Sequence, residues 1–99
     1  MAEKITSEDG ILEIVRSSMI YPGMGPKSVQ GAVRNLGSSK VDAEISVDFY
    51  DMSDNLLGNS TAVFKDIEPN EEKLFDVWAE RLPNMYEVEY FKIKSVRTI

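Results

Sequence analysis

Apolar and polar residues alternate strictly over residues 41–49. The odd positions Val41, Ala43, Ile45, Val47 and Phe49 are apolar, and the even positions between them are polar. Successive side chains of a strand point to opposite faces, so this period of two predicts a β-strand with one buried face.

A second strand is predicted immediately upstream, where Val29, Gly31, Val33 and Asn35 share one face. Residues 37–40 have the composition of a turn, so we expect the two strands to form an antiparallel hairpin. Gly31 in the middle of a strand indicates either a bulge or the close approach of a neighbouring side chain or backbone.

Turn-forming residues separate further strand-like stretches along the chain. The predicted strands cover residues 11–21, 56–64, 73–79 and 86–96, and the predicted turns and connections cover residues 22–26, 51–55, 69–71 and 81–84. In the stretch 73–79, burying Phe75 and Val77 leaves Asp76 in water, which places Leu74 and Trp78 on the outer face. The alternation slips near Tyr90, which predicts a bulge there.

Six or seven short strands at intervals near ten residues, with no amphipathic helical pattern, predict an all-β antiparallel sandwich. A parallel sheet would require helices between the strands, and no such alternation is present. We expect residues 1–10 to be a polar tail and residues 11–99 to be a single β-sandwich domain.

Several of these segments, in this order, resemble the FxLYD domain family. They are residues 28–35 (SVQGAVRN), 43–51 (AEISVDFYD), 57–58 (LG), 67–71 (IEPNE) and Phe75. The family has a V-x-G-x-V-x-N strand, a tyrosine–aspartate pair after the next strand, and a proline turn before a phenylalanine strand. The resemblance covers roughly residues 28–77, with Phe49 in place of the usual leucine and Asn70 in place of a frequent glycine.

The resemblance implies an immunoglobulin-like β-sandwich of Greek-key type without an assigned biochemical role. Its structural motif maps onto Gly31, Asn35, Phe49, Tyr50, Asp51, Pro69 and Phe75. The family is often found in prokaryotic cell-envelope or secreted proteins. The first ten residues, MAEKITSEDG, lack the basic and apolar regions of a signal peptide.

Three motif residues are expected to serve the fold. Tyr50 breaks the apolar rhythm of its strand, so its ring should cover the edge of the sandwich, with its hydroxyl on a backbone partner. Asp51 should accept hydrogen bonds from amides of its own turn, and Asn35, at the end of its strand, should bond to backbone in the same way.

The composition argues against catalysis. The 99 residues include no His and no Cys, which excludes an imidazole base, a thiolate nucleophile and a disulfide frame. Glu87 and Glu89 would share an exposed strand face where both are ionised, and no Gly-x-Ser-x-Gly elbow is present. We therefore expect a non-catalytic domain without a cofactor.

The charge narrows the class of partner. Eleven basic residues against seventeen acidic residues give a net charge of -6. Without a cluster of Lys and Arg, the chain is not expected to bind nucleic acid or an anionic membrane surface. Its apolar stretches are far shorter than the roughly 20 residues needed to cross a bilayer. A protein partner or self-association is the remaining expectation.

Two surfaces are candidates for binding. The first is aromatic and apolar: Trp78 with Leu74 on one strand, and Met24 in the loop that precedes the second strand. A loop or the N-terminal segment covering Trp78 is the alternative interpretation for that residue.

The second candidate is an acidic turn. Asp51, Asp54 and Asp48 offer oxygen ligands for Ca²⁺, although an EF-hand loop starting at Asp51 would need Gly and a carboxylate where Leu56 and Ala62 stand. A small-ligand or Ca²⁺-binding sandwich is therefore the alternative to an interaction domain, and an ordinary solvated turn is the structural interpretation of the same residues.

Overall fold

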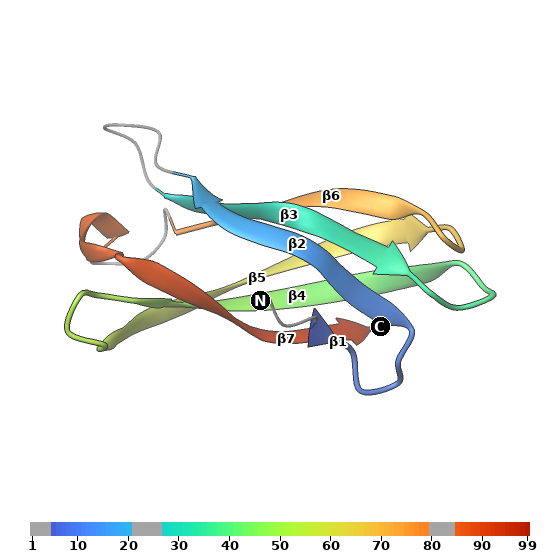
Figure 1. Cartoon of the computed structure of the whole chain (residues 1–99), viewed down its shortest axis with the longest axis horizontal. Helices are drawn as coiled ribbons and strands as arrows, with labels where there is room; N and C mark the ends of the chain where they lie inside the picture. Colours follow the sequence, from blue (N-terminus) through green and yellow to red (C-terminus); the bar gives the residue numbers. More distant parts are fainter. Residues whose placement is uncertain (1–4, 21–26, 80–84) are drawn as a thin grey trace.

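The computed structural model describes residues 5–20, 27–79 and 85–99. These residues form seven strands and one 3-10 turn: β1 (Ile5–Thr6), β2 (Leu12–Ile20), β3 (Ser28–Asn35), β4 (Val41–Tyr50), β5 (Leu56–Ile67), β6 (Glu72–Trp78), η1 (Met85–Glu87) and β7 (Tyr90–Thr98). All pairings are antiparallel, and the strands form a four-stranded sheet in the order β1-β2-β3-β6 and a three-stranded sheet in the order β5-β4-β7 (Figure 1). The prediction of an all-β antiparallel sandwich is confirmed.

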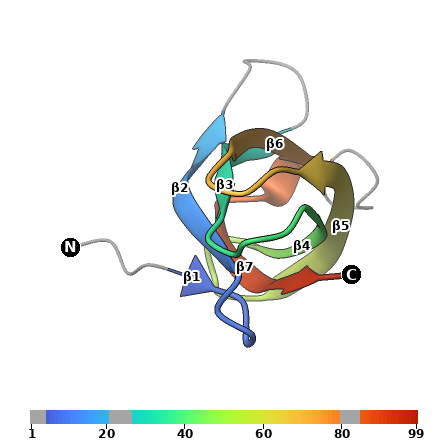
Figure 2. The same ribbon diagram turned by 90° about the vertical axis from the view of Figure 1, so that its right-hand side faces the viewer.

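The connections have an immunoglobulin-like, Greek-key order. The chain leaves β3 for the other sheet, forms the β4–β5 hairpin, and returns to place β6 beside β3. It then crosses again to place β7 beside β4. The edges of the two sheets approach each other on both sides, with β5 near β6 and β2 near β7 (Figure 2).

The hairpin predicted between β3 and β4 is wrong, because these strands lie in different sheets. Alternation shows which face of a strand is buried, but it does not show which strand is its hydrogen-bonded neighbour. The same face is buried whether the next strand along the chain pairs in the same sheet or packs across the core. Residues 36–40 therefore form a corner between the sheets.

The core lies between the sheets and contains the inward faces predicted for β3, β4 and β6. The buried apolar residues are Leu12, Ile14, Val29, Val33, Ala43, Ile45, Val47, Phe49, Ile67, Phe75, Val77, Ala79, Val88 and Val96. Phe49, which replaces the usual leucine of the resembling family, is completely buried.

Asn35 joins the corner between the sheets to the end of β5. Its side chain is fully buried. The amide Nδ2 donates to the carbonyl oxygens of Ser39 at 2.8 Å and Ile67 at 2.9 Å, and Oδ1 accepts the N–H of Gly37 at 2.8 Å. Its own N–H and C=O bond to the turn between β5 and β6. The predicted side-chain to backbone role is confirmed.

The turn between β5 and β6 follows from Pro69 and Asn70. The N–H of Glu71 donates to the carbonyl of Glu68 at 3.0 Å, and Asn70 has a φ of 65°. Proline at the second position and a left-handed residue at the third are the signature of a type II turn, where Asn serves in place of Gly.

At Gly31 in β3, atoms of both neighbouring strands approach closely. A bulge between Ile14 and Arg16 shifts the register of β2 against β3. A methyl group on Gly31 would overlap the backbone oxygen of Arg16 and lie 2.7 Å from Cζ of Phe75. The predicted close approach is present, because a backbone oxygen and an aromatic ring both lie next to Gly31. A bulge is present as well, but it lies in the neighbouring strand β2.

The N-terminal segment belongs in part to the sandwich. The sequence predicts a polar tail over residues 1–10, but Ile5 and Thr6 pair with β2 as β1. The carboxylate of Asp9 then accepts the hydroxyl of Thr98 in β7 at 2.5 Å. This side-chain hydrogen bond and the pairing of β1 with β2, which a local pattern does not reveal, hold the segment against the sandwich.

The last strand starts later than predicted, because residues 85–87 form η1 and β7 begins at Tyr90. The predicted bulge near Tyr90 is also misplaced. Val47 pairs with Ile93 and Ser46 with Ser95, so Lys94 is the extra residue. Tyr90 faces outward opposite Tyr50, and the alternation slips only further along, where Ile93 and Val96 both have to face the core.

Replacing Asn35 by alanine should destabilise the fold strongly, because two carbonyls and one amide lose their buried partner. We expect the free energy of unfolding to fall by about 3 kcal/mol and the Tm by roughly 12 to 24 °C. Urea and thermal denaturation followed by circular dichroism measure both. The exposed Asn55, whose side-chain amide donates to Asp51, is the control, and Asn55→Ala should cost less than about 1 kcal/mol. Equal effects of the two variants would contradict this role of Asn35.

Gly31→Ala should lower the free energy of unfolding by about 2 kcal/mol, because the methyl group overpacks the junction. The same denaturation measurements apply. Replacing the ring of Phe75 by a smaller side chain, in the double variant Gly31→Ala/Phe75→Leu, should not restore the free energy of unfolding of the native chain. The backbone oxygen of Arg16 would still overlap the added methyl group. A fully restored double variant would show that only the ring of Phe75 limits the space.

Candidate functional site

The turn after β4 is closed by Asp51. One carboxylate oxygen accepts the backbone N–H groups of Ser53 and Asn55, each at 2.9 Å, and the other accepts the side-chain amide of Asn55 at 3.1 Å. These bonds hold the pKa of Asp51 below its usual value, and the bond from the backbone N–H of Asn55 has the largest effect. The predicted structural role of Asp51 is confirmed.

The three carboxylates considered for Ca²⁺ do not converge. Asp48 accepts the side-chain amide of Asn59 at 2.8 Å, whereas Asp54 accepts the hydroxyl of Tyr90 at 2.6 Å. Asp51 is used by its own turn. Nowhere in the described part of the chain do three acidic side chains gather closely enough to hold a metal ion.

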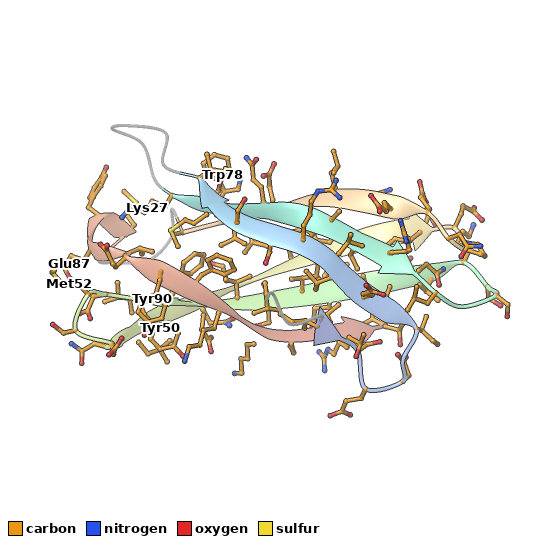
Figure 3. The ribbon with its side chains drawn as sticks, viewed as in Figure 1. Lys27, Tyr50, Met52, Trp78, Glu87 and Tyr90 are labelled. Carbon is orange, nitrogen blue, oxygen red and sulfur yellow. The ribbon has the colours of Figure 1, made fainter. Side chains whose placement is uncertain are left out.

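Tyr50 lies on the outer face of the three-stranded sheet. Its ring stacks on Tyr90 with the centroids 5.0 Å apart and the planes at 8°, and the ammonium of Lys92 lies 5.4 Å from its centroid (Figure 3). The expected backbone partner of its hydroxyl is not found among the described residues, because Tyr90 stands directly opposite and the ring is held by stacking. The hydroxyl that is bonded belongs to Tyr90, and its bond to Asp54 raises the pKa of Tyr90 to about 12.

Leu74 and Trp78 point outward from β6, as the alternation predicts. Leu74 is 72% exposed and Trp78 is 41% exposed. Trp78 stands near one end of the four-stranded sheet (Figure 3). The third residue of the predicted apolar surface, Met24, lies outside the described residues.

The outer face of β6 consists of Leu74, Asp76 and Trp78, and we call these three residues the β6 face. The β2–β3–β6 register places each of them in a row across the sheet: Leu74 beside Ala32 and Arg16, Asp76 beside Gln30 and Ser18, and Trp78 beside Ser28 and Ile20. Ile20, itself 38% exposed, thereby extends the apolar surface from Trp78 to β2.

Two open depressions meet at Asp76. One, of about 390 Å³, crosses the outer face of the sheet between Arg16 and Asp76. The other, of about 420 Å³, lies in the seam between β5 and β6, with Ser60 on one side and Trp78 on the other. Asp76 lines both depressions.

Asp76 is also the unpaired carboxylate of this surface. The neighbouring Glu72 is neutralised by two guanidinium groups, Arg16 at 3.4 Å and Arg34 in direct hydrogen-bond contact. Asp76 has no ion pair or hydrogen bond to its side chain within the described residues. The β6 face therefore presents one negative charge between two apolar side chains. Sequence patterning finds the outward direction of these residues, whereas Ile20 and the depressions are found only from the strand register.

A second exposed apolar pair lies at the end of the sandwich formed by the β4–β5 turn and η1. Met52 is 83% exposed and Tyr86 is 70% exposed. Both line a depression of about 410 Å³ together with Asp51 and Glu87. No strand edge runs through this depression, which makes the pair a suitable control surface for the β6 face.

The fold defines a seven-stranded immunoglobulin-like β-sandwich within the described residues. Comparison with models of protein families, with curated proteins and with solved structures finds no match. The described part of the chain contains no helix with the length and apolar character needed to span a bilayer.

Asp54→Asn should lower the pKa of Tyr90 from about 12 toward its ordinary value near 10, because the charged acceptor is lost. Because the pKa of Tyr90 is raised in the folded state, its bond to Asp54 stabilises that state fully below pH 10. This contribution to stability disappears as the pH rises from 10 through 12. Titration of the tyrosine ζ-carbon by NMR measures the shift. Asp48→Asn is the control and should leave Tyr90 unchanged; an unshifted Tyr90 in Asp54→Asn would contradict the role of this bond.

Proposed function

We propose that this chain is a non-catalytic immunoglobulin-like interaction domain that binds another protein through the β6 face. The observation that carries the proposal is the pair of exposed apolar side chains, Leu74 and Trp78, on either side of the unpaired carboxylate of Asp76. A large aromatic side chain beside a charged group is typical of the residues that dominate protein interfaces.

The motif that resembles the FxLYD family supports a separation between residues that build the fold and residues that bind a partner. Asn35 and Asp51 bond to backbone, and Gly31 allows three strands to pack closely. These residues build the sandwich and leave its outer surface to define a partner. We propose membership of that family, which favours an accessory role at the prokaryotic cell envelope or in a secreted protein.

The energetic argument favours burial of the β6 face. Removing apolar surface from water contributes about 25 cal/mol per Å², and exposed Leu74 and Trp78 realise this contribution only on contact with a partner. The acidic turn offers no comparable gain, because the oxygens of Asp51 are already occupied by amides. Binding through the β6 face is therefore favoured over Ca²⁺ binding at the turn.

Replacing both apolar residues in Leu74→Ser/Trp78→Ser should abolish binding without unfolding the domain, since both side chains lie outside the core. The immobilised native chain should retain a protein from lysate that the double variant does not retain. The matched control Met52→Ser/Tyr86→Ser removes an exposed apolar pair away from the β6 face and should behave as the native chain. Equal loss in both variants, or in neither, would contradict the proposal. So would a rise in Tm with millimolar Ca²⁺.

A further inference from the structure

We infer that β6 is an open sheet edge that takes up an extended segment of a partner protein as an added strand. Every second side chain of that segment faces outward. The central one of these is basic, and the one on each side of it is apolar. The inference rests on the proposed function, because it names the chemistry of a partner for the same surface.

The edge position of β6 follows from the pairing. Among the described residues, β6 is the last strand of its sheet and pairs only with β3. Residues of an antiparallel strand direct their N–H and C=O groups alternately to one side and to the other. The carbonyl of Glu71 accepts the N–H of Asn35, and the N–H of Ala79 donates to the carbonyl of Lys27, so the odd residues bond toward β3.

The even residues therefore direct their backbone groups to the open side. The hydroxyl of Ser60 in β5 donates to the carbonyl of Trp78 at 2.9 Å, which is the direction expected for an even residue. Neither Leu74 nor Asp76 has a backbone partner on that side within the described residues. Unpaired N–H and C=O groups along an edge are a template for a further strand.

The seam beside this edge contains an open depression next to Asp76. The depression between β5 and β6, about 420 Å³, is lined on the β6 side by Asp76, Val77 and Trp78. A bound segment would pair with the open-side N–H and C=O groups of Leu74 and Asp76, because the carbonyl of Trp78 is already bonded to Ser60.

The side chains of the β6 face specify the segment. Side chains directly opposite each other on paired strands interact, and opposite charges stabilise the pair. Asp76 therefore selects Lys or Arg at the central position, whereas Leu74 and Trp78 select apolar residues two positions away on each side. The net charge of -6 attracts a basic segment over longer distances.

A second copy of the chain fits this edge poorly. Antiparallel pairing of two β6 strands centred on Asp76 would place the two Asp76 carboxylates opposite each other. Centred on Leu74, the same pairing would place Asp76 opposite Glu72. Like charges directly opposite destabilise a pair of strands, so the occupant is a different chain that supplies the positive charge.

The inference is tested with the synthetic peptide Thr-Val-Thr-Lys-Thr-Val-Thr, whose Val, Lys and Val side chains share one face. The native chain should bind it at least about fivefold more tightly than the peptide with Glu in place of Lys. Asp76→Lys should reverse this preference. Glu8→Lys makes the same change of charge in the turn after β1 and should leave the preference unchanged.

Amide hydrogen exchange reports the backbone part of the inference. Saturating lysine peptide should slow exchange of the Leu74 and Asp76 amides at least about tenfold, and a peptide N-methylated at alternate residues should neither bind nor protect them. Binding without protection of these amides would overturn strand addition. So would failure of the native chain to bind the lysine peptide.

The two proposals fail separately. If the lysine peptide does not bind while Leu74→Ser/Trp78→Ser still removes a protein contact, the β6 face is an interaction surface of another kind. If Leu74→Ser/Trp78→Ser also has no effect on any association, the proposed function is wrong as well.

Discussion

The buried side chain of Asn35 satisfies the backbone groups at the place where the chain passes from one sheet to the other. Buried polar groups need partners, and the corner brings the carbonyls of Ser39 and Ile67 and the N–H of Gly37 around a single amide. The backbone of Asn35 bonds in addition to the turn that starts β6. The backbone of Asn35 thereby marks the start of the β3–β6 pairing, and its side chain holds the corner between the sheets beside that point.

A second constraint acts on the same sheet from its middle. The bulge in β2 brings the backbone of Arg16 toward Gly31, and the ring of Phe75 closes the same space from β6. Because Gly31 has no side chain, the three strands can pack close together at this point. Their outer side chains then form rows across the sheet, and the apolar rows of Leu74 and Trp78 enclose the row of Asp76.

The residues that build the sandwich and the residues that can bind a partner are almost entirely separate. Asn35, Asp51 and Pro69 act through turns, and Tyr50 acts through stacking on Tyr90. None of these contributes to the β6 face. Conversely, Leu74 and Asp76 make no side-chain hydrogen bond within the described residues and are available to a partner. In a chain without His or Cys, the interaction that we propose relies on exposed apolar groups, one carboxylate and a backbone edge.

Local features followed from the sequence because they depend on only a few neighbouring residues. The alternation of β4, the outward direction of Leu74 and Trp78, the self-bonded turn at Asp51 and the left-handed Asn70 are of this kind. Long-range features did not follow: β3 and β4 lie in different sheets, Ile5 and Thr6 form a strand, and Lys94 is the extra residue. Each of these depends on a partner distant in sequence. The sequence by itself thus determined which side chains face water, and only the tertiary structure decided that β6 is an edge, because strand pairing is settled by packing across the whole sandwich.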